Sequence, residues 1–287
     1  MALFQKKEKK PPEPQYFTSA TNEQVYNYNV YYMSKREKIL LFIVSFIIGA
    51  LVGFLFYGGI GKDENGHATI VTYVCNIAVI VIGGLIATFV VKPIYLESKI
   101  SKRKNILRTQ FIDLLDSLAT SISSGKNIPN SFISARDDLF LQYDSDDYIV
   151  KETNNIIVGI ENNIAVEDLL IDFGERSGIQ DITNFGYVFQ TVYKKGGNIK
   201  DTIMSCHDLL REKIEIELTI STKIASAKNE QNIMLIMPVV LVAMLKMIGS
   251  DFAKNFATPT GIISTTIAVI MFVIAYFVGR KLSEIEV

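Results

Sequence analysis

Four long apolar stretches dominate the hydrophobic pattern of the chain. Two lie near the N-terminus at residues 39–60 and 68–91, and two lie near the C-terminus at residues 233–249 and 261–279. A bilayer core of roughly 30 Å needs about 20 apolar residues in a helix, so each stretch is predicted to be a transmembrane helix. The third contains Pro238, which membrane helices tolerate. The pattern predicts transmembrane pairs within residues 38–92 and 232–279.

Between these pairs, residues 93–231 follow a helical period. Apolar residues recur at spacings of three and four, the pattern of an amphipathic helix. In the first such helix they are Leu107, Phe111, Leu114, Leu115, Leu118 and Ile122. The helix is expected to end at Gly125, a residue type that accepts the left-handed conformation. Asn127, followed by Pro129, is expected to begin the next helix.

The segment around Gly125 has a counterpart 71 residues later, where Gly196 and Asn198 occupy the equivalent positions. Asn-Ile pairs at 127, 163 and 198 suggest a repeat of about 35 residues, the length of one helical hairpin. We expect an all-α fold with an antiparallel bundle of about six helices in three hairpins. Its first helix would continue from the second span, and its last would run into the third. The expected turns and caps are Gly125, Asn127, Asn163, Gly196, Gly197 and Asn198. A tetratricopeptide array shares this period, but its aromatic, glycine and alanine pattern does not occur.

Basic residues set the expected orientation in the membrane. The flanks before the first stretch, after the second and after the fourth are rich in lysine and arginine, whereas each connecting loop has one lysine. By the positive-inside rule, both termini and residues 93–231 are cytoplasmic. Residues 1–37, which lack a helical period, are expected to be a disordered tail, and residues 280–287 a second tail. The basic segment at 99–108 is expected to anchor the first cytoplasmic helix at the lipid surface.

The chain contains few residues suited to catalysis. The loop KKGGNIK at 194–200 lacks the G-x-x-x-x-G-K-[ST] spacing of a phosphate-binding loop. His67 and His207 are predicted on opposite sides of the membrane, and no metal-binding spacing occurs. We therefore predict a non-enzymatic protein without cofactor or metal. The net charge of −1 gives no reason to expect nucleic acid as a partner.

Acidic residues gather between Asp137 and Asp181, where twelve occur and only Lys151 and Arg176 oppose them. Two interpretations remain open: a solvated surface, or a docking face for a basic partner. The candidate face for such a partner comprises Glu167, Asp168, Asp172 and Glu175, together with Arg211.

Several segments taken in order resemble a known family. They are FIDLLDSLATSISSGKNIPNSF, GIENNIAVEDLLIDFGERSGIQDI, YKKGGNIKDTIMSCHDLLREKIEIE and SAKNEQNIMLIMPVV. With their place between membrane pairs, they resemble the type II secretion system F family, the inner-membrane platform proteins of type II secretion and type IV pili. The layout is most similar to the platform of Tad (Flp) pili, which has one such domain. The segment FGERSGIQDI is less basic than the family pattern, which puts a partner surface there in doubt.

The resemblance implies a non-enzymatic, oligomeric platform in the cytoplasmic (inner) membrane. Its partners would be a hexameric secretion ATPase supplied in trans, pilin subunits, membrane lipids, and a sister platform protein or a second copy. The domain at 93–231 would receive the motion of the ATPase, with Pro238 as a candidate transmembrane pivot. The alternatives are a transporter or permease subunit and a membrane sensor. A transporter usually carries ionisable residues within its spans, and here only Lys246, near a span end, qualifies. The outer loops, of about seven and eleven residues, are too short to fold a ligand-binding sensor domain.

Overall fold

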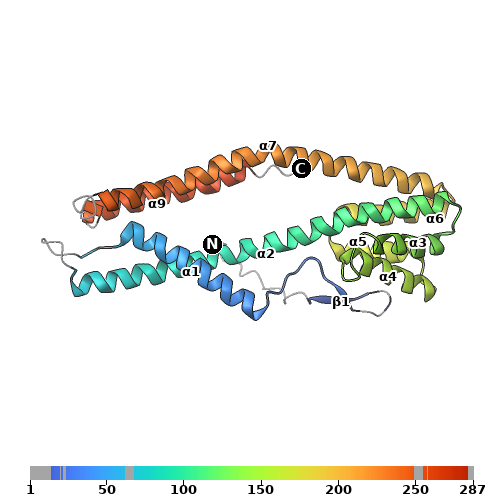
Figure 1. Ribbon diagram of the computed structural model, residues 1–287, viewed down its shortest axis with the longest axis horizontal. Helices are drawn as coiled ribbons and strands as arrows, with labels where there is room; N and C mark the ends of the chain where they lie inside the picture. The colour runs from blue at the N-terminus through green and yellow to red at the C-terminus, as the bar shows by residue number, and fades with distance from the viewer. Residues whose placement is uncertain are drawn as a thin grey trace, which may run out of the picture. The chain divides into compact units, whose positions relative to one another are not determined.

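The fold is described from a computed structural model, shown in Figure 1, that covers residues 14–19, 21, 24–61, 68–248, 255–256 and 258–283. It divides into two compact units. One, the helical domain, consists of Met1–Tyr32 and Leu96–Glu215, and the other, the apolar unit, of Met33–Tyr95 and Ile216–Val287. The described elements confirm the predicted all-helical class, with one small two-stranded sheet added.

The elements follow one another along the chain as a short β-hairpin and then helices (Figure 1). They are β1 (Tyr16–Thr18), β2 (Gln24–Tyr26), α1 (Lys35–Tyr57), α2 (Ile70–Ser123), α3 (Ile128–Phe140), α4 (Tyr148–Glu161), α5 (Val166–Ser177), α6 (Gln180–Lys195), α7 (Ile199–Ile248) and α9 (Pro259–Ser283). The helices α2 and α7 are each unbroken and contribute to both units. Two of the unit boundaries therefore fall inside these helices, at 95/96 in α2 and at 215/216 in α7.

The core of the helical domain forms where the apolar face of α2 meets α3, α5 and α6. The ring of Phe111 lies edge-on to Phe173, at 6.0 Å between centroids, and to Phe185, at 5.4 Å. The residues of the predicted α2 face from Leu107 to Leu118 are almost completely buried. Burial of one such side chain contributes about 1.5–3 kcal/mol, so this face supplies much of the free energy that holds the bundle together.

Glycines end α2 and α6, and an asparagine follows each turn. Gly125 and Gly196 have φ values of +84° and +70°, in the left-handed region that disfavours residues with a Cβ atom. The side chain of Asn127 accepts a hydrogen bond from the Asn130 N–H at 3.0 Å and thereby caps α3. Asn198 accepts the equivalent bond from the Asp201 N–H at 3.3 Å at the start of α7.

The middle turn is built differently from the other two. Asn163 does not cap the following helix but itself adopts the left-handed conformation after α4, with φ +62°. The residue before α5 is Ala165, whose side chain makes no capping bond. Asparagine tolerates this conformation better than most residues, so Asn163 has the role at the middle turn that Gly125 and Gly196 have at the first and third turns.

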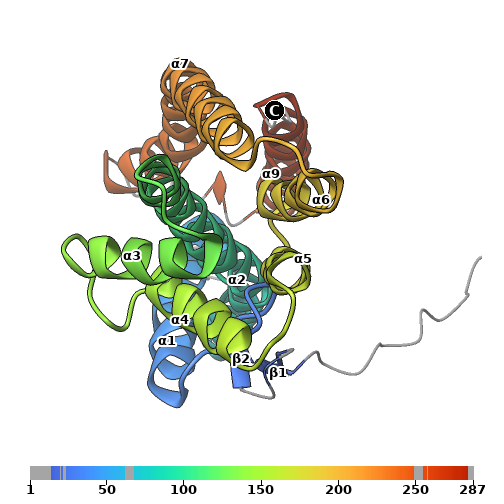
Figure 2. The ribbon, with the colours of Figure 1, turned by 90° about the vertical axis from the view of Figure 1, so that its right-hand side faces the viewer.

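The predicted disordered tail is replaced, over its described residues, by a structured segment. The strands β1 and β2 pair antiparallel, with Phe17 opposite Val25. After them, Tyr28 is only 1% exposed and belongs to the core of the helical domain. Figure 2 shows both strands beside the end of α4. Local periodicity did not predict this ordered segment, because contacts with residues more than 70 positions away in the chain hold it in place.

The apolar unit contains two helices that are long and apolar enough to cross a membrane, α1 and α2. Only 6% of the apolar window of each is buried inside the structure, so neither is the core helix of a soluble fold. The apolar parts of α7 and α9 are shorter, at Asn232–Met247 and Pro259–Ala275. The predicted loop at 62–67 and the end of the third predicted span at 249 lie outside the described residues.

Close backbone contact joins α1 to α2. A Cβ atom added to Gly49 would lie 2.4 Å from the Gly83 carbonyl oxygen and 2.4 Å from the Ala87 Cβ. A Cβ atom added to Gly83 would lie 2.7 Å from the Gly49 carbonyl oxygen. Small residues at such crossings let two membrane helices approach closely.

Candidate functional site

A buried ionic network joins the N-terminal segment, α4 and α5. The guanidinium of Arg176 on α5 forms two hydrogen bonds with the carboxylate of Glu152 on α4, at 2.9 and 3.3 Å. The Arg176 Nε donates to Asp172 at 2.7 Å, and the Tyr28 hydroxyl donates to Glu152 at 2.9 Å. The side chains of Arg176 and Glu152 are only 7% and 3% exposed. Three segments of the chain therefore depend on one buried pair of charges.

The electrostatics of the network keep its charges in place. Burial lowers the pKa of Arg176, but the carboxylates of Glu152 and Asp172 outweigh it and raise that pKa overall. Burial, followed by the charge of Glu152 and its hydrogen bond, raises the pKa of Tyr28 well above its usual range. Arg176 is thus cationic and Tyr28 protonated at neutral pH, and the hydroxyl of Tyr28 acts as a hydrogen-bond donor.

Basic residues of α2 hold the same N-terminal segment from its other side. The guanidinium of Arg103 lies over three tyrosine rings, with centroid distances of 5.2 Å to Tyr31, 5.8 Å to Tyr148 and 5.9 Å to Tyr26. The Nζ of Lys104 donates to the Asn29 side chain at 2.7 Å and to the Gly178 carbonyl at 3.1 Å.

These contacts change the interpretation of the basic segment at 99–108, which the sequence predicted to be a lipid-surface anchor. Arg103 and Lys104 are engaged within the helical domain, and Arg108 forms an ion pair with Asp181 at 2.7 Å. Partial burial lowers the pKa of Lys104, and oxygen atoms of Asn29 and Gly178 accept hydrogen bonds from its ammonium group. Three cations of the segment therefore stabilise the fold.

One carboxylate connects the two helices that continue into the apolar unit. Asp181, at the start of α6, lies 2.7 Å from the Arg108 Nε on α2 and 2.8 Å from the Lys213 Nζ on α7. The side chains of Arg108 and Asp181 are each 13% exposed, so solvent screens their attraction only in part. Asp181 consequently couples α2 to α7 inside the helical domain.

The acidic residues predicted as a partner face do not share one surface. Asp168, Asp172 and Glu175 recur along one side of α5, and of these Asp168 and Glu175 are exposed. Glu167 is buried, and its Oε2 has no hydrogen-bond partner among the described residues. Arg211 lies on α7, where it pairs with Glu215 at 3.7 Å.

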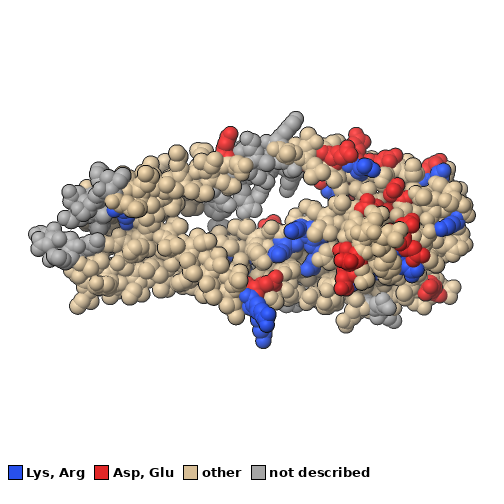
Figure 3. Space-filling model, in the orientation of Figure 1, with Lys and Arg blue, Asp and Glu red and all other residues tan. Residues whose placement is uncertain are grey.

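The exposed part of the face is thus Asp168 and Glu175, with the half-buried Asp172 between them, and we call these three residues of α5 the acidic stripe. Within this stripe Asp172 is bound to Arg176, and Glu175 accepts a hydrogen bond from the Tyr187 hydroxyl at 2.9 Å. In the face drawn in Figure 3, charged side chains gather on the helical domain and are sparse over the apolar helices.

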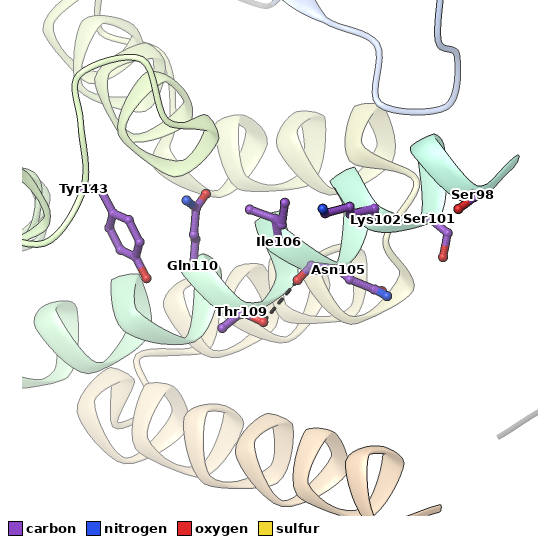
Figure 4. Close-up of a pocket in the computed structure, with 8 residues that line it drawn as sticks. All are labelled: Ser98, Ser101, Lys102, Asn105, Ile106, Thr109, Gln110 and Tyr143. Carbon is purple, nitrogen blue, oxygen red and sulfur yellow. Dashed lines mark hydrogen bonds between the residues drawn. The ribbon is translucent and has the colours of Figure 1, made fainter. Parts of the chain in front are cut away.

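An open groove runs along α2, where Tyr143 closes one end (Figure 4). Its lining on α2 is mostly uncharged and polar, and Lys102 is the only charged side chain among the residues drawn. Tyr143 donates a hydrogen bond to Asp113. Within the described part of the chain, no three His, Cys, Asp or Glu side chains are grouped so as to hold a metal ion.

The sequence did not single out Glu152, Asp181 or Tyr28. It did show Arg176 as one of two cations in an acidic region, with Asp172 one helical turn before it. That spacing predicts the pair within α5. Glu152 on α4 is 24 residues from Arg176, and Tyr28, which donates to Glu152, is 124 residues from it, beyond the reach of any local pattern. Comparison of the chain with family models, curated proteins and solved structures found no match.

Proposed function

We propose that this protein is a non-enzymatic platform in the cytoplasmic membrane that couples a secretion ATPase, supplied in trans, to assembly of a type IV-like pilus of the Tad (Flp) kind or to type II-like secretion. The proposal rests on the resemblance in sequence to the type II secretion system F family. The observation in the structure that supports it best is the pair α2 and α7. Each is a continuous helix with one part in the helical domain and another in the apolar unit.

A displacement of the helical domain would pass along these helices because helices are stiff along their axes. The ion pairs of Asp181 with Arg108 and Lys213 bind α2 and α7 to the same point of α6. A force on the domain would therefore act on both helices together. Pro238 lies within α7, where its ring removes one backbone hydrogen bond, and is the proposed pivot. Pro93 has the same effect within α2.

The contacts inside the apolar unit fit four antiparallel spans. The Lys246 Nζ near the end of α7 donates to the Gly58 carbonyl at the end of α1, at 3.3 Å. The Tyr57 hydroxyl at the same end of α1 donates to Thr266 of α9 at 3.2 Å. The end of α1 thus contacts the end of α7 and the first half of α9, as expected if both helix pairs turn on the outer side of the membrane.

The same contact of Lys246 weighs against the transporter alternative. A lysine that binds substrate needs free donors within a cavity of the membrane region. The ammonium of Lys246 instead binds the carbonyl that follows α1 and lies 5.5 Å from the centroid of the Phe256 ring. This position, at the C-terminal end of a helix, suits a cation that stabilises the helix ends.

The proposed function is tested by affinity purification of the tagged full chain together with the products of neighbouring genes, and by deletion of its gene. We expect a hexameric ATPase to copurify and the deletion strain to lose its surface fibres or its secreted substrate. The proposal would be contradicted if no ATPase copurified and the deletion strain kept both its surface fibres and its secreted substrate.

The acidic stripe on α5 is the proposed contact for a basic surface of the ATPase. Charge reversal by D168K together with E175K should weaken copurification, and more so at low salt, because attraction between exposed charges is screened by ions. The control is D137K with D146K, which reverses two exposed acids outside α5. If both double variants copurified the same amount of ATPase, the stripe would be excluded as the contact.

A further inference from the structure

The N-terminal segment is placed to do more than cover the helical domain. We call residues 14–32 the strap; of these, residues 20, 22 and 23 lie outside the part of the chain that the structure describes. It ends at Tyr32, and after Met33 the next residue, Ser34, is the N-cap of α1. Ser34 and Glu37 form a capping box, in which the Ser34 N–H donates to Glu37 at 2.9 Å and the Glu37 N–H donates to Ser34 at 3.2 Å. Only Met33 therefore separates the strap from the N-cap of the first apolar helix.

The strap is fastened to the helical domain at several points. Thr21 donates to the Asn155 side chain on α4 at 2.6 Å. The Tyr28 hydroxyl enters the buried pair of Glu152 and Arg176. Asn29 accepts from Lys104 of α2 at 2.7 Å. Two of these contacts are made with α4 and the third with α2, and of the three strap residues only Tyr28 is fully buried.

Along the chain, α1 is connected to the helical domain by two routes, one from each of its ends. The route from the C-terminal end of α1 is long, because it passes through the loop after α1 and through the whole apolar part of α2 before it reaches the helical domain. The strap is the short route. We propose that the strap is a coupling device in which Tyr28 is the latch, so that docking of Tyr28 between α4 and α5 holds the first turn of α1 to the helical domain.

This device goes beyond the proposed platform function, because it gives the helical domain a third connection to the apolar unit besides α2 and α7. Unlike those helices, the strap is held to the rest of the helical domain by hydrogen bonds between side chains, from Thr21 to Asn155, from Tyr28 to Glu152 and from Lys104 to Asn29. It can therefore be released without breaking a helix. A change at α4 or at the end of α5 that opens the Glu152–Arg176 pair would release Tyr28 and leave the strap held by the contacts of Thr21, Asn29 and Val30, so the hold on α1 would loosen, whereas α2 and α7 would stay connected.

Hydrogen exchange of the full chain in detergent, followed by mass spectrometry, tests the latch. In Tyr28→Ala, amides of the strap, such as that of Asn27, which donates to Gln15, should exchange about tenfold faster or more. Peptides covering Ser34–Lys38 should also exchange faster, whereas those covering the α5–α6 core should not change. Tyr28→Phe, which keeps the ring and removes only the hydroxyl, should give the same pattern with a smaller increase.

The matched control is Tyr187→Phe, which removes a phenol-to-carboxylate hydrogen bond of the same length, 2.9 Å, from the surface of the same domain. It should leave both the strap and Ser34–Lys38 unchanged. Faster exchange in the strap without any change at Ser34–Lys38 would overturn the coupling. An unchanged strap in Tyr28→Ala would overturn the latch.

A cross-link separates release of the strap from damage to the domain. Thr21→Cys with Asn155→Cys, in a chain that also carries Cys75→Ala and Cys206→Ala, places two thiols at side chains that touch in the docked strap. A short bifunctional maleimide should join them, and in the Tyr28→Ala background the joined chain should regain slow exchange at Ser34–Lys38. Fast exchange that persists after cross-linking would contradict the proposal. Neither experiment requires an ATPase or a pilus, so failure of the latch and failure of the platform function are distinguishable.

Discussion

The hydroxyl of Tyr28 donates a hydrogen bond to the carboxylate of Glu152 at 2.9 Å, across 124 residues of the chain. The carboxylate is also bound by Arg176, so the phenol completes the solvation of a buried anion. A hydrogen bond to a charged group contributes about 1.5–3 kcal/mol, more than one between neutral groups. This relationship makes the N-terminal segment part of the helical domain.

Removal of Arg176 should be the most damaging single change in this network. Arg176→Ala leaves Glu152 buried without its cation, which costs about 3–5 kcal/mol. Thermal unfolding of the full chain in detergent, followed by circular dichroism, should show a large fall in Tm. Lys151→Ala, which breaks an exposed pair with Asp146, should cost less than about 1 kcal/mol. Similar falls in Tm for the two variants would show that the buried pair of Arg176 and Glu152 does not stabilise the fold.

Asp181→Asn tests the link between α2 and α7. The neutral amide loses the charge that binds Arg108 and Lys213, at a cost of about 1.5–3 kcal/mol. Hydrogen exchange should become faster at the start of α7, where Lys213 lies. Asp208→Asn is the control, because this carboxylate is 71% exposed and contacts only its neighbour His207 among the ion pairs of the described residues. Unchanged exchange in Asp181→Asn would argue against the link.

Gly196 should resist substitution because of its backbone alone. Its φ is +70°, and an added Cβ atom would meet no heavy atom within 4 Å. Gly196→Val should therefore cost about 1 kcal/mol or more through conformational strain, and Gly196→Asn clearly less, because asparagine tolerates the left-handed region. Thermal unfolding of the two variants tests this: equal Tm values would mean that strain in the left-handed conformation does not cause the loss of stability.

Gly49→Ala tests the crossing of α1 and α2. The added methyl group would overlap the Gly83 carbonyl and Ala87, so the helices must separate and lose contact. We expect a lower Tm in detergent and more aggregation. Val52→Ile adds one methylene group at a residue of α1 that is 37% exposed and should leave both quantities unchanged. If Gly49→Ala behaved like Val52→Ile, the close crossing would be ruled out.

The stability of the helical domain should fall at high pH. Burial and a neighbouring carboxylate raise the pKa of both Tyr28 and Tyr143. Above the usual tyrosine pKa of about 10, the unfolded chain releases protons that the folded chain keeps, so the free energy of unfolding falls as pH rises. Below that value the effect is absent. Tm measured from pH 8 to about 11 should fall less steeply in Tyr28→Phe with Tyr143→Phe than in the unaltered chain; parallel curves would contradict the assignment.

Local patterns predicted those parts of the structure that depend on neighbours in the sequence. The i, i+3, i+4 spacing from Leu107 to Leu118 predicted the buried face of α2, because a helix with one apolar face must cover it. Gly125 and Gly196 were predicted as turns for a similar reason, since few other residues adopt positive φ without strain. The turn at Asn163 fits the pattern less well, because the left-handed residue there is the asparagine itself.

Charged residues were harder to place. Charge density suggested an acidic face from Glu167 to Glu175, but burial depends on which side of α5 meets its neighbours. Only the structure shows that Glu167 faces inward and that Asp172 belongs to Arg176. The same holds for Arg103 and Lys104, whose tyrosine and asparagine partners lie in the strap.

The sequence by itself determined the helical class, the apolar stretches and the turns, because these follow from side-chain periodicity and backbone preference within a few residues. Only the tertiary structure decided that Tyr28 docks between α4 and α5 and that Asp181 binds α2 and α7. Such contacts join residues far apart in the chain. They exist because the burial of a charge is favourable only where the rest of the fold supplies its partner.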